Sequence, residues 1–221
     1  RLRYQVSKFE DAGKSRTEEY HSGTNKKTDS DIANIIDQWC APRSMVNPLI
    51  YIVKDEILAG NLSREHRLFV TYLNDVLQNV ILISKLSSEE NGYLMDLEFY
   101  PADMPLGRLE FAIVNMINIL AAEGCSMLSL GGTYGCKLAP SSNADPELDK
   151  TLNYLREQNI FNDEGNLQFK NKFRPENSTV FLCRAVANSN PDNVTDIIMM
   201  IADPVRMQTS DTENHTSFKL H

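Results

Sequence analysis

The sequence predicts an α/β domain in which helices flank a mixed, mainly antiparallel β-sheet. Residues 67–100 contain three consecutive segments rich in β-branched and aromatic residues, which is typical of an antiparallel meander. A strongly apolar helix is predicted at 107–123, and a strand follows it at once at 126–130. A helix that joins two neighbouring strands of one sheet implies a right-handed parallel crossover. A sheet covered by helices is the layer arrangement that results.

Three helices are predicted ahead of this sheet. Apolar residues at helical spacing predict a first helix that ends at Gly13. Ser30 is predicted to cap the second helix, and Asn47 with Pro48 to begin the third. The polar stretch 15–25 is expected to be a loop or an edge strand.

The meander is predicted as strands at 67–73, 76–84 and 93–100, with a turn at Asn74 and Asp75. Because strand side chains alternate between faces, the third strand has an apolar face and an acidic face. The apolar face should pack inward, and the acidic face should look toward a cleft or toward solvent. These faces are Tyr93, Met95, Leu97 and Phe99, and Leu94, Asp96, Glu98 and Tyr100.

The C-terminal third is predicted to mix loops, short helices and one more strand. Its predicted elements are a loop at 133–142, a helix from Asp145-Pro146, a turn at 163–166, a strand at 178–186 and a short helix between Pro191 and Pro204. No repeat or linker divides the chain, so residues 1–204 are predicted to form one domain and 205–221 a flexible tail. Because the chain starts without Met and inside a predicted helix, we expect it to be part of a longer protein.

Composition and charge narrow the classes of partner. The chain has 221 residues, 42% of them hydrophobic and 24% charged, as in ordinary globular domains. A net charge of −8 argues against a broad binding surface for duplex DNA or for an anionic membrane. No apolar run approaches the ~20 residues of a membrane span. The four cysteines show no metal-ligand spacing, so we expect free thiols, no metal site and a cytoplasmic location.

Two short segments carry most of the functional signal, and the first is the end of the strand at 126–130. Gly131 and Gly132 follow this strand directly. Glycine permits positive φ angles and close approach of a substrate backbone. A simple turn at the end of a strand needs the same freedom, so both interpretations stay open.

The second segment sets three cations at alternate positions, Lys170, Lys172 and Arg174, with Phe169 and Phe173 four residues apart. In a strand or extended turn the cations would share one face, whereas on a helix the two phenylalanines would pack together. The functional interpretation is a phosphate site, for a tRNA 3′ end or a phosphorylated acceptor, in which Lys170 is foremost. The alternative is a solvated basic edge that discourages strand pairing.

The order of these elements resembles the GNAT acyltransferase fold, and several motifs resemble one branch of it. That branch comprises the C-terminal catalytic region of bacterial phosphatidylglycerol lysyltransferases and the Fem-type aminoacyl-tRNA-dependent transferases. The resemblance covers roughly residues 1–186. Its motifs are the opening helix at Leu2-Arg3, Trp39, Met95-Asp96-Leu97, Pro105-Leu106-Gly107, Leu130-Gly131-Gly132-Thr133 and Phe169-Lys170-Asn171-Lys172-Phe173.

The resemblance implies that the strand after the long helix splays from its neighbour and opens a cleft. It also implies a further GNAT-like lobe upstream, as is usual in the lysyltransferases. The sequence departs from the family's pattern at two places. These departures bear on which donor and acceptor are used more than on the fold. Glu98-Phe99 stands where an arginine usually follows the Asp-Leu pair, and Glu176-Asn177 stands where a tryptophan is usual.

The turn before the long helix bears on the choice of donor. Acetyl-CoA-dependent GNAT enzymes usually carry a glycine-rich turn there, whose N–H groups bind pyrophosphate. This chain has Met104 and Leu109 at two of these positions, and Pro105 removes an N–H donor, which disfavours a pyrophosphate site. Gly107 and Arg108 remain candidates for substrate binding, with Arg108 either at a phosphate or simply solvated.

Amide or ester formation from an activated acyl ester needs a base for the acceptor proton, oxyanion stabilisation and alignment of the reactants. We expect Glu98 or Asp96 to take the proton and Tyr100 to serve the leaving group, and a solvent-exposed acidic edge is the alternative. The four histidines show no triad partners, which disfavours a hydrolase. The expected substrate-binding residues are Gly107, Arg108, Gly131, Gly132, Thr133, Lys170, Lys172 and Arg174.

Three functions follow as hypotheses. The first is transfer of an aminoacyl group from aminoacyl-tRNA to an amine or hydroxyl of a lipid, peptidoglycan precursor or small metabolite, without a cofactor. The second keeps the enzyme class but uses acyl-CoA or an acyl carrier protein as the donor. The third is a non-catalytic GNAT-like binding module in a larger assembly. A location at the inner face of the membrane would come through a region upstream of this chain.

Overall fold

The computed structural model describes residues 1–43, 46–87, 89–103, 105–133, 136, 145–157 and 163–181. The chain divides into two compact units. The first unit comprises Arg1–Arg43 and Ile50–Gly131, and the second comprises Ser44–Leu49 and Gly132–His221. The predicted domain limit at residue 204 and the predicted tail at 205–221 lie outside the described residues.

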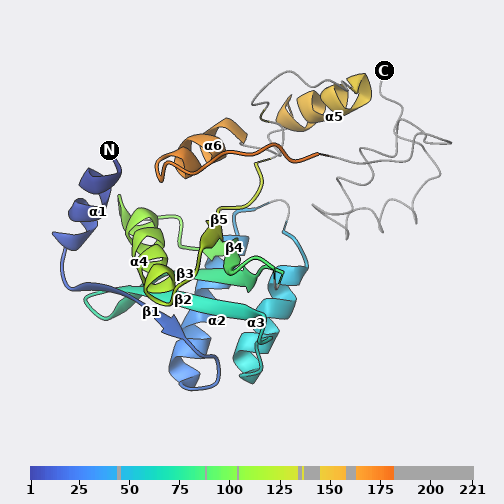
Figure 1. Cartoon of the computed structure of the whole chain (residues 1–221). Coiled ribbons are helices and arrows are strands. Elements are labelled where there is room, and N and C mark those ends of the chain that lie inside the picture. The colour runs from blue at the N-terminus through green and yellow to red at the C-terminus, as the bar shows by residue number, and fades with distance from the viewer. Residues whose placement is uncertain are drawn as a thin grey trace, which may run out of the picture. The chain divides into compact units, whose positions relative to one another are not determined.

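The first unit is built on a five-stranded sheet whose strands lie in chain order (Figure 1). β1 to β4 are antiparallel neighbours, and β5 runs parallel to β4. This confirms the mixed, mainly antiparallel sheet, and the stretch 15–25 contains its edge strand. The strands are β1 (Ser15–Tyr20), β2 (His66–Leu73), β3 (Val76–Lys85), β4 (Gly92–Phe99) and β5 (Met127–Ser129).

Helices cover both faces of this sheet. α1 (Leu2–Glu10) and α4 (Arg108–Ala122) lie on one face, and α2 (Lys26–Cys40) and α3 (Leu49–Ala59) lie on the other (Figure 1). Side-chain contacts identify the two faces. Arg67 of β2 reaches Glu123 at the end of α4, whereas the ring of Phe99 in β4 lies 5.5 Å from that of Trp39 in α2.

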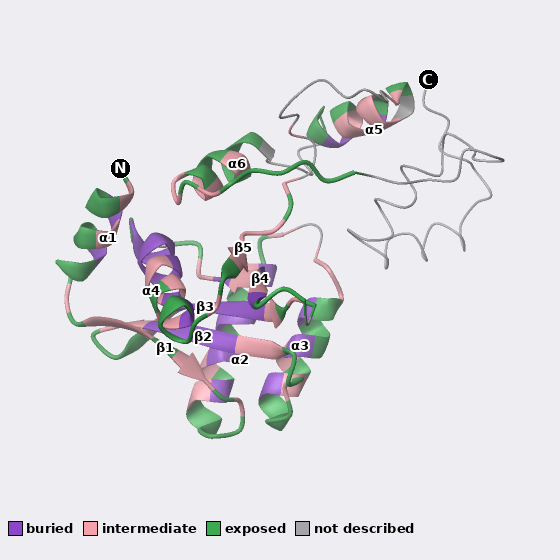
Figure 2. Cartoon of the chain, viewed as in Figure 1, coloured by how far each residue is buried: buried purple, intermediate pink, exposed green. Residues whose placement is uncertain are grey.

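The core lies on both sides of the two central strands. Figure 2 shows the buried residues concentrated in β2, β3 and α4. Neighbouring residues of β2, Leu68 and Phe69, are both fully buried although they point to opposite helix layers, as are Ile81 and Leu82 of β3. A strand with two buried faces needs no polar alternation, which explains the continuous apolar runs in the sequence.

The turns and helix starts follow local chemistry. Asn74 and Asp75 have φ angles of +50° and +62°, which gives the hairpin turn predicted between β2 and β3. The predicted cap at Ser30 is wrong, because Asn25 is extended and its side-chain oxygen accepts from the N–H of Thr28 and Lys27. Ser30 lies inside α2, where its hydroxyl donates to a backbone carbonyl one turn earlier.

The second unit contains α5 (Pro146–Glu157) and α6 (Asp163–Asn171). The start of α5 agrees with the prediction, but the turn predicted at 163–166 is wrong, because α6 begins there. A glycine inside a helix, such as Gly165 here, lowers helix stability by only about 1 kcal/mol relative to Ala, so packing of the helix can outweigh it. Residues 178–181 of the predicted strand are not in a strand, and its remainder lies outside the described residues, as do the short helix predicted before Pro204 and most of the predicted loop 133–142.

Within the described parts of the chain, no helix combines the length and apolar character needed to cross a membrane.

Candidate active site

β4 and β5 pair over only three residues and then separate. The ladder joins Gly92 to Met127 and ends where Leu94 opposes Ser129, whereas β4 continues to Phe99. Along Met95–Phe99, therefore, no β5 residue pairs with β4 in the described chain. The predicted splay of the central strands is confirmed, and it leaves the peptide groups on this edge of β4 without a β5 neighbour.

The chain leaves β5 through a turn that requires glycine. The φ angle of Gly131 is +76°, in the left-handed region that other residues seldom adopt, and its N–H lies 3.2 Å from the Ser129 hydroxyl. Gly131 is the last residue of the first unit, and Gly132 and Thr133 belong to the second. The strand-end role is thus observed for Gly131, and contact of Gly131 and Gly132 with a substrate stays a prediction.

A β-bulge interrupts the alternation of β4. Leu82 of β3 pairs with Leu97, and the next residue, Ile83, pairs with Met95, so that Asp96 is one extra residue on β4. An extra residue moves the side chains beyond it to the other face. The single apolar face and single acidic face expected along the whole of this strand are therefore wrong.

Asp96 and Glu98 consequently lie on opposite faces of the sheet. Glu98 is half-buried and opposes Ile81, which shares the α4 face with Arg67. Asp96 is exposed and accepts a short hydrogen bond from the hydroxyl of Ser84 on the α2 face. The two carboxylates cannot serve one reacting atom together, so they are alternative rather than paired candidates for a base. Tyr100 follows the strand and is half-buried, and its predicted role stays a prediction.

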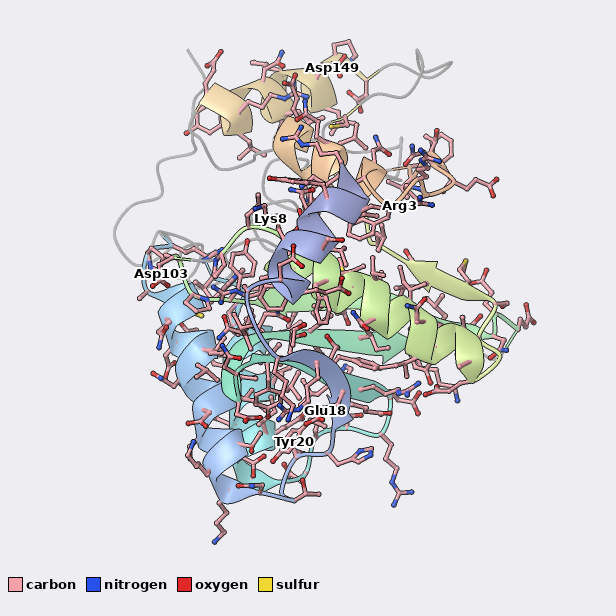
Figure 3. The ribbon with its side chains drawn as sticks, turned by 90° about the vertical axis from the view of Figure 1, so that its left-hand side faces the viewer. Arg3, Lys8, Glu18, Tyr20, Asp103 and Asp149 are labelled. Carbon is pink, nitrogen blue, oxygen red and sulfur yellow. The ribbon has the colours of Figure 1, made fainter. Side chains whose placement is uncertain are left out.

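Gly107 is required by packing against α1. Its φ angle is +89°, and a Cβ built there would lie 1.8 Å from the carbonyl oxygen of Gln5. The first turn of α4, where acetyl-CoA-dependent enzymes hold pyrophosphate, thus abuts the backbone of α1. Figure 3 shows α1, which carries Arg3 and Lys8, lying along α4.

Arg108 is buried, so the alternative of a solvated side chain is wrong, and its contact with a phosphate stays a prediction. It is only 3% exposed, and its Nη1 donates to the carbonyl of Gln78 at 2.7 Å. Burial lowers its pKa to about 10, partly offset by the negative charge of Asp103, which is labelled in Figure 3. A phosphate could reach this guanidinium only if the junction of α1 and α4 opened.

The same junction holds three buried polar atoms without a hydrogen-bond partner in the described structure. They are Gln5 Oε1, Asn79 Oδ1 and Arg108 Nε. Asn79 is held to the start of α4, with its amide nitrogen 3.5 Å from the Arg108 carbonyl. Burial keeps these polar atoms away from bulk water, and roles of Gly107 and Arg108 in substrate binding stay predictions.

The cations of the second unit do not alternate along a strand, because Lys170 lies in the last turn of α6. Its Nζ donates to the carbonyl of Gly132 at 3.0 Å. Lys172 lies over the ring of Phe169 at 4.8 Å, and the Phe169 and Phe173 rings are 5.6 Å apart. The two phenylalanines pack together as expected, although Phe173 lies two residues beyond the end of α6, and the strand placement considered for the cations is wrong. Arg174 follows α6 with a φ angle of +54°.

Reasoning from the sequence missed a network of charged side chains in the first unit. Arg67 binds Glu19 and Glu123, which come from β1 and from the residue after α4. The hydrogen bonds to Glu19 and Glu123 raise the pKa of Arg67, and they outweigh burial, which lowers it. Finding this network from sequence would have required the β1–β2 register, which residue types alone do not encode.

Comparisons with known proteins agree with this fold. One similar structure, described as the C-terminal domain (DUF2156) of a lysylphosphatidylglycerol synthetase from Agrobacterium fabrum, is 17% identical, with a TM-score of 0.61 over 93% of this chain. The structure of L-PGS from Bacillus licheniformis is 14% identical, with a TM-score of 0.59 over 79%. The chain spans 60% and 51% of these two chains. A search of curated proteins gives no match.

These likenesses establish the fold, and the predicted resemblance to the phosphatidylglycerol lysyltransferases is confirmed. The model of one family matches residues 1–184, which is most of the chain. The chain belongs to the family described as phosphatidylglycerol lysyltransferase, C-terminal.

Proposed function

We propose that this chain is an acyltransferase domain that moves an aminoacyl group from aminoacyl-tRNA to an amine or hydroxyl acceptor. The observation that carries the proposal is the end of the β4–β5 ladder at Leu94 and Ser129. Beyond it, the β4 peptide groups of Met95–Phe99 face no β5 residue and can hydrogen-bond an extended acyl donor, as an added strand would.

The start of α4 argues against acyl-CoA as the donor. A pyrophosphate site needs several free N–H groups and open space at the first helical turn. Here Pro105 has no N–H, and the Gln5 carbonyl lies directly against Gly107. An aminoacyl ester of tRNA places no pyrophosphate at this position, so the same geometry is compatible with it.

The proposed reaction needs no enzyme nucleophile. The acceptor nitrogen or oxygen attacks the ester carbonyl of the donor, a new amide or ester bond forms, and the bond to the tRNA ribose oxygen breaks. The acceptor loses one proton, and the released ribose hydroxyl gains one. Glu98 is the proposed base, because it is half-buried and lies on the splayed strand, and Tyr100 is the proposed proton donor.

The second unit carries a cationic segment of its own. Lys170 holds the Gly132 carbonyl and so links α6 to the glycine turn beyond β5. A lysine at this place favours a phosphate of the tRNA 3′ end, with Lys172 and Arg174 nearby in sequence as further phosphate contacts. This local site is compatible with the net charge of −8.

The proposed acceptor and location are supported by the family description and not by particular side chains of this structure. The family description makes phosphatidylglycerol the first acceptor to examine, which would place the reaction at the inner face of the membrane. Peptidoglycan precursors and small amines are the other acceptors to include.

A direct assay separates the candidates. The purified chain would be offered a mixture of aminoacyl-tRNAs, and separately acyl-CoAs, with vesicles containing phosphatidylglycerol or with soluble amines, and products would be read by mass spectrometry. We expect transfer from aminoacyl-tRNA and none from acyl-CoA, and we expect Glu98→Gln to abolish most of it.

Transfer from acyl-CoA alone would favour the second hypothesis and reject the proposed donor. Transfer from neither donor would favour the non-catalytic binding module. The Arg16→Ala variant, which changes an exposed ion pair of β1, is the matched control for nonspecific effects.

A further inference from the structure

Side chains from two directions hold the start of the β4–β5 pair, whereas at its other end the two strands no longer pair. β5 follows α4 after a short connection of Glu123, Gly124, Cys125 and Ser126. Gly92, which opposes Met127, has no room for a side chain, since a Cβ there would lie 2.4 Å from the Met127 carbonyl oxygen. The two strands therefore form a wedge whose closed end is at these residues.

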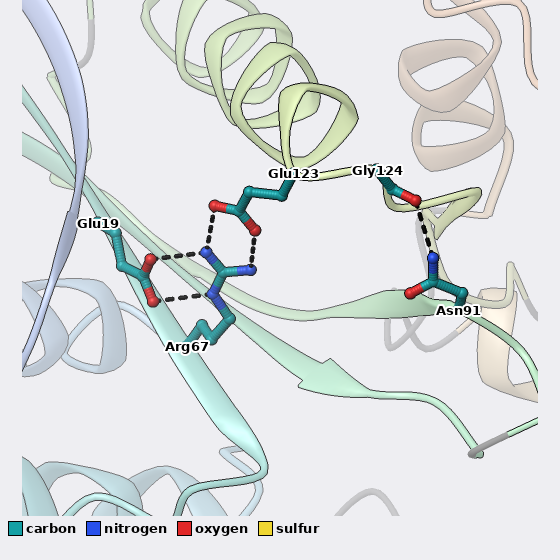
Figure 4. A network of polar contacts seen from close by, with 5 residues as sticks. All are labelled: Glu19, Arg67, Asn91, Glu123 and Gly124. Carbon is teal, nitrogen blue, oxygen red and sulfur yellow. Dashed lines mark hydrogen bonds and ion pairs between the residues drawn. The ribbon is translucent and has the colours of Figure 1, made fainter.

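Asn91 fastens the turn from the β4 side. Its side-chain amide donates to the carbonyl of Gly124 at 2.8 Å, and its own carbonyl accepts from both the N–H and the hydroxyl of Ser126 at 2.8 Å. One residue thus makes three hydrogen bonds to the segment that leads into β5. Figure 4 shows the amide contact.

Arg67 fastens the same turn from the sheet. Its guanidinium binds both oxygens of Glu123, at 2.7 and 2.8 Å, and both oxygens of Glu19, at 2.8 and 2.6 Å (Figure 4). It also lies 5.2 Å from the centre of the Tyr93 ring in β4. The end of α4 is thereby linked to β1, β2 and β4 at once, in the bidentate geometry that holds guanidinium and carboxylate most firmly.

We propose that Asn91 and Arg67 are positioning residues that fix the closed end of the wedge. Because β5 is only three residues long, its direction is set by how firmly that end is held. The direction of β5 in turn sets how far it diverges from β4 beyond Leu94 and Ser129. The expected effect on the rate of transfer rests on the proposed function. The expected effect on the position of β5 rests on the contacts alone.

The test combines hydrogen exchange with transfer kinetics in the Asn91→Ala variant. This variant keeps the backbone carbonyl and two of the three bonds, so it should fold. Asn115→Ala is the matched control, because its amide also donates to one backbone carbonyl, that of Phe111, at 2.9 Å inside α4. We expect amide exchange in residues 125–131 to rise roughly fivefold in Asn91→Ala only, the equivalent of one ordinary hydrogen bond.

We also expect kcat to fall roughly tenfold while KM for the donor stays within about twofold, since misalignment lowers the rate more than affinity. Unchanged exchange in 125–131, or raised exchange with unchanged kcat, would overturn the inference. If the wild-type chain transferred nothing, the proposed function would fail, and the exchange result alone would decide whether Asn91 fixes the wedge.

Discussion

Asp96 and Glu98, two residues apart on β4, point to opposite faces of the sheet because a β-bulge separates them. Glu98 is half-buried, and Asp96 is exposed and bonded to Ser84.

Substitutions of Glu98 and Asp96 should therefore have different effects on the kinetics of transfer. Glu98→Gln should lower kcat roughly 100-fold with little change in KM, because a base acts in the transition state. Asp96→Asn should change either constant less than about threefold. Equal losses in the two variants, measured by steady-state transfer, would contradict the assignment of the base.

Gly107 and Gly124 provide a matched pair for the contact between α1 and α4. Both have positive φ angles, +89° and +82°, but a Cβ at Gly107 would meet the Gln5 carbonyl, whereas one at Gly124 meets nothing within 4 Å. Gly124→Ala should lower the free energy of unfolding by about 1 kcal/mol, from backbone strain alone. Gly107→Ala should lower it by about 3 kcal/mol, because α1 must also move. Urea denaturation measures both, and similar values would show that α1 is not held at this point.

Removal of the Arg67 guanidinium should destabilise the first unit. Its side chain is 15% exposed, and both carboxylates that it binds would lose their charged partner. Arg67→Ala should lower the free energy of unfolding by roughly 2 kcal/mol, as for hydrogen bonds to partly buried charges. Arg16→Ala, which removes the exposed pair with Asp75, should cost about 0.5 kcal/mol or less. A cost for Arg67→Ala no larger than that of the control would argue against the network in Figure 4.

The contribution of Arg67 should depend on pH in one direction. Its hydrogen bond lowers the pKa of Glu123 below the ordinary value of 4.5, so the folded state favours the ionised carboxylate. The resulting stability is fully present above pH 4.5 and is lost as pH falls through the lowered pKa. The difference in unfolding free energy between wild type and Arg67→Ala should therefore be constant near neutral pH and shrink below about 4.5. A difference that grows on acidification would contradict this sign.

Lys170 offers a test of the cationic segment. Because its Nζ donates to Gly132, Lys170→Ala removes both a charge and a link to the glycine turn. We expect KM for the aminoacyl-tRNA donor to rise roughly tenfold, as for loss of one charge-assisted hydrogen bond, with the thermal unfolding midpoint nearly unchanged. Lys27→Ala removes an equal charge from an exposed pair on α2 and is the control. Donor affinity that is the same in both variants would remove the phosphate site.

The sequence predicts this fold well where local signals agree with packing. The strands of the meander, the Asn74-Asp75 turn, the long apolar helix and the parallel strand after it all follow from residue type and periodicity. These signals were strong because β2 and β3 are buried on both faces and α4 lies against them.

The candidate site was harder to predict, for identifiable reasons. The bulge at Asp96 depends on the register with β3, which no local pattern encodes. Arg108 resembled a surface cation, but it is buried because its guanidinium reaches the Gln78 carbonyl. The α6 helix was missed because Gly165 and Asn166 favour a turn locally, and the packing of Phe169 with Phe173 opposes that preference.

The central claim is that the edge of β4 beyond its pairing with β5 receives the donor, and amide exchange protection by a bound donor tests it most directly. The ligand would be a non-hydrolysable 3′-aminoacyl analogue on a tRNA acceptor-stem minihelix. The account predicts that amides within residues 95–99 and 130–131 become protected when the analogue binds, while those in α3 do not change. Binding that protects other parts of the chain and leaves residues 95–99 unchanged would contradict it.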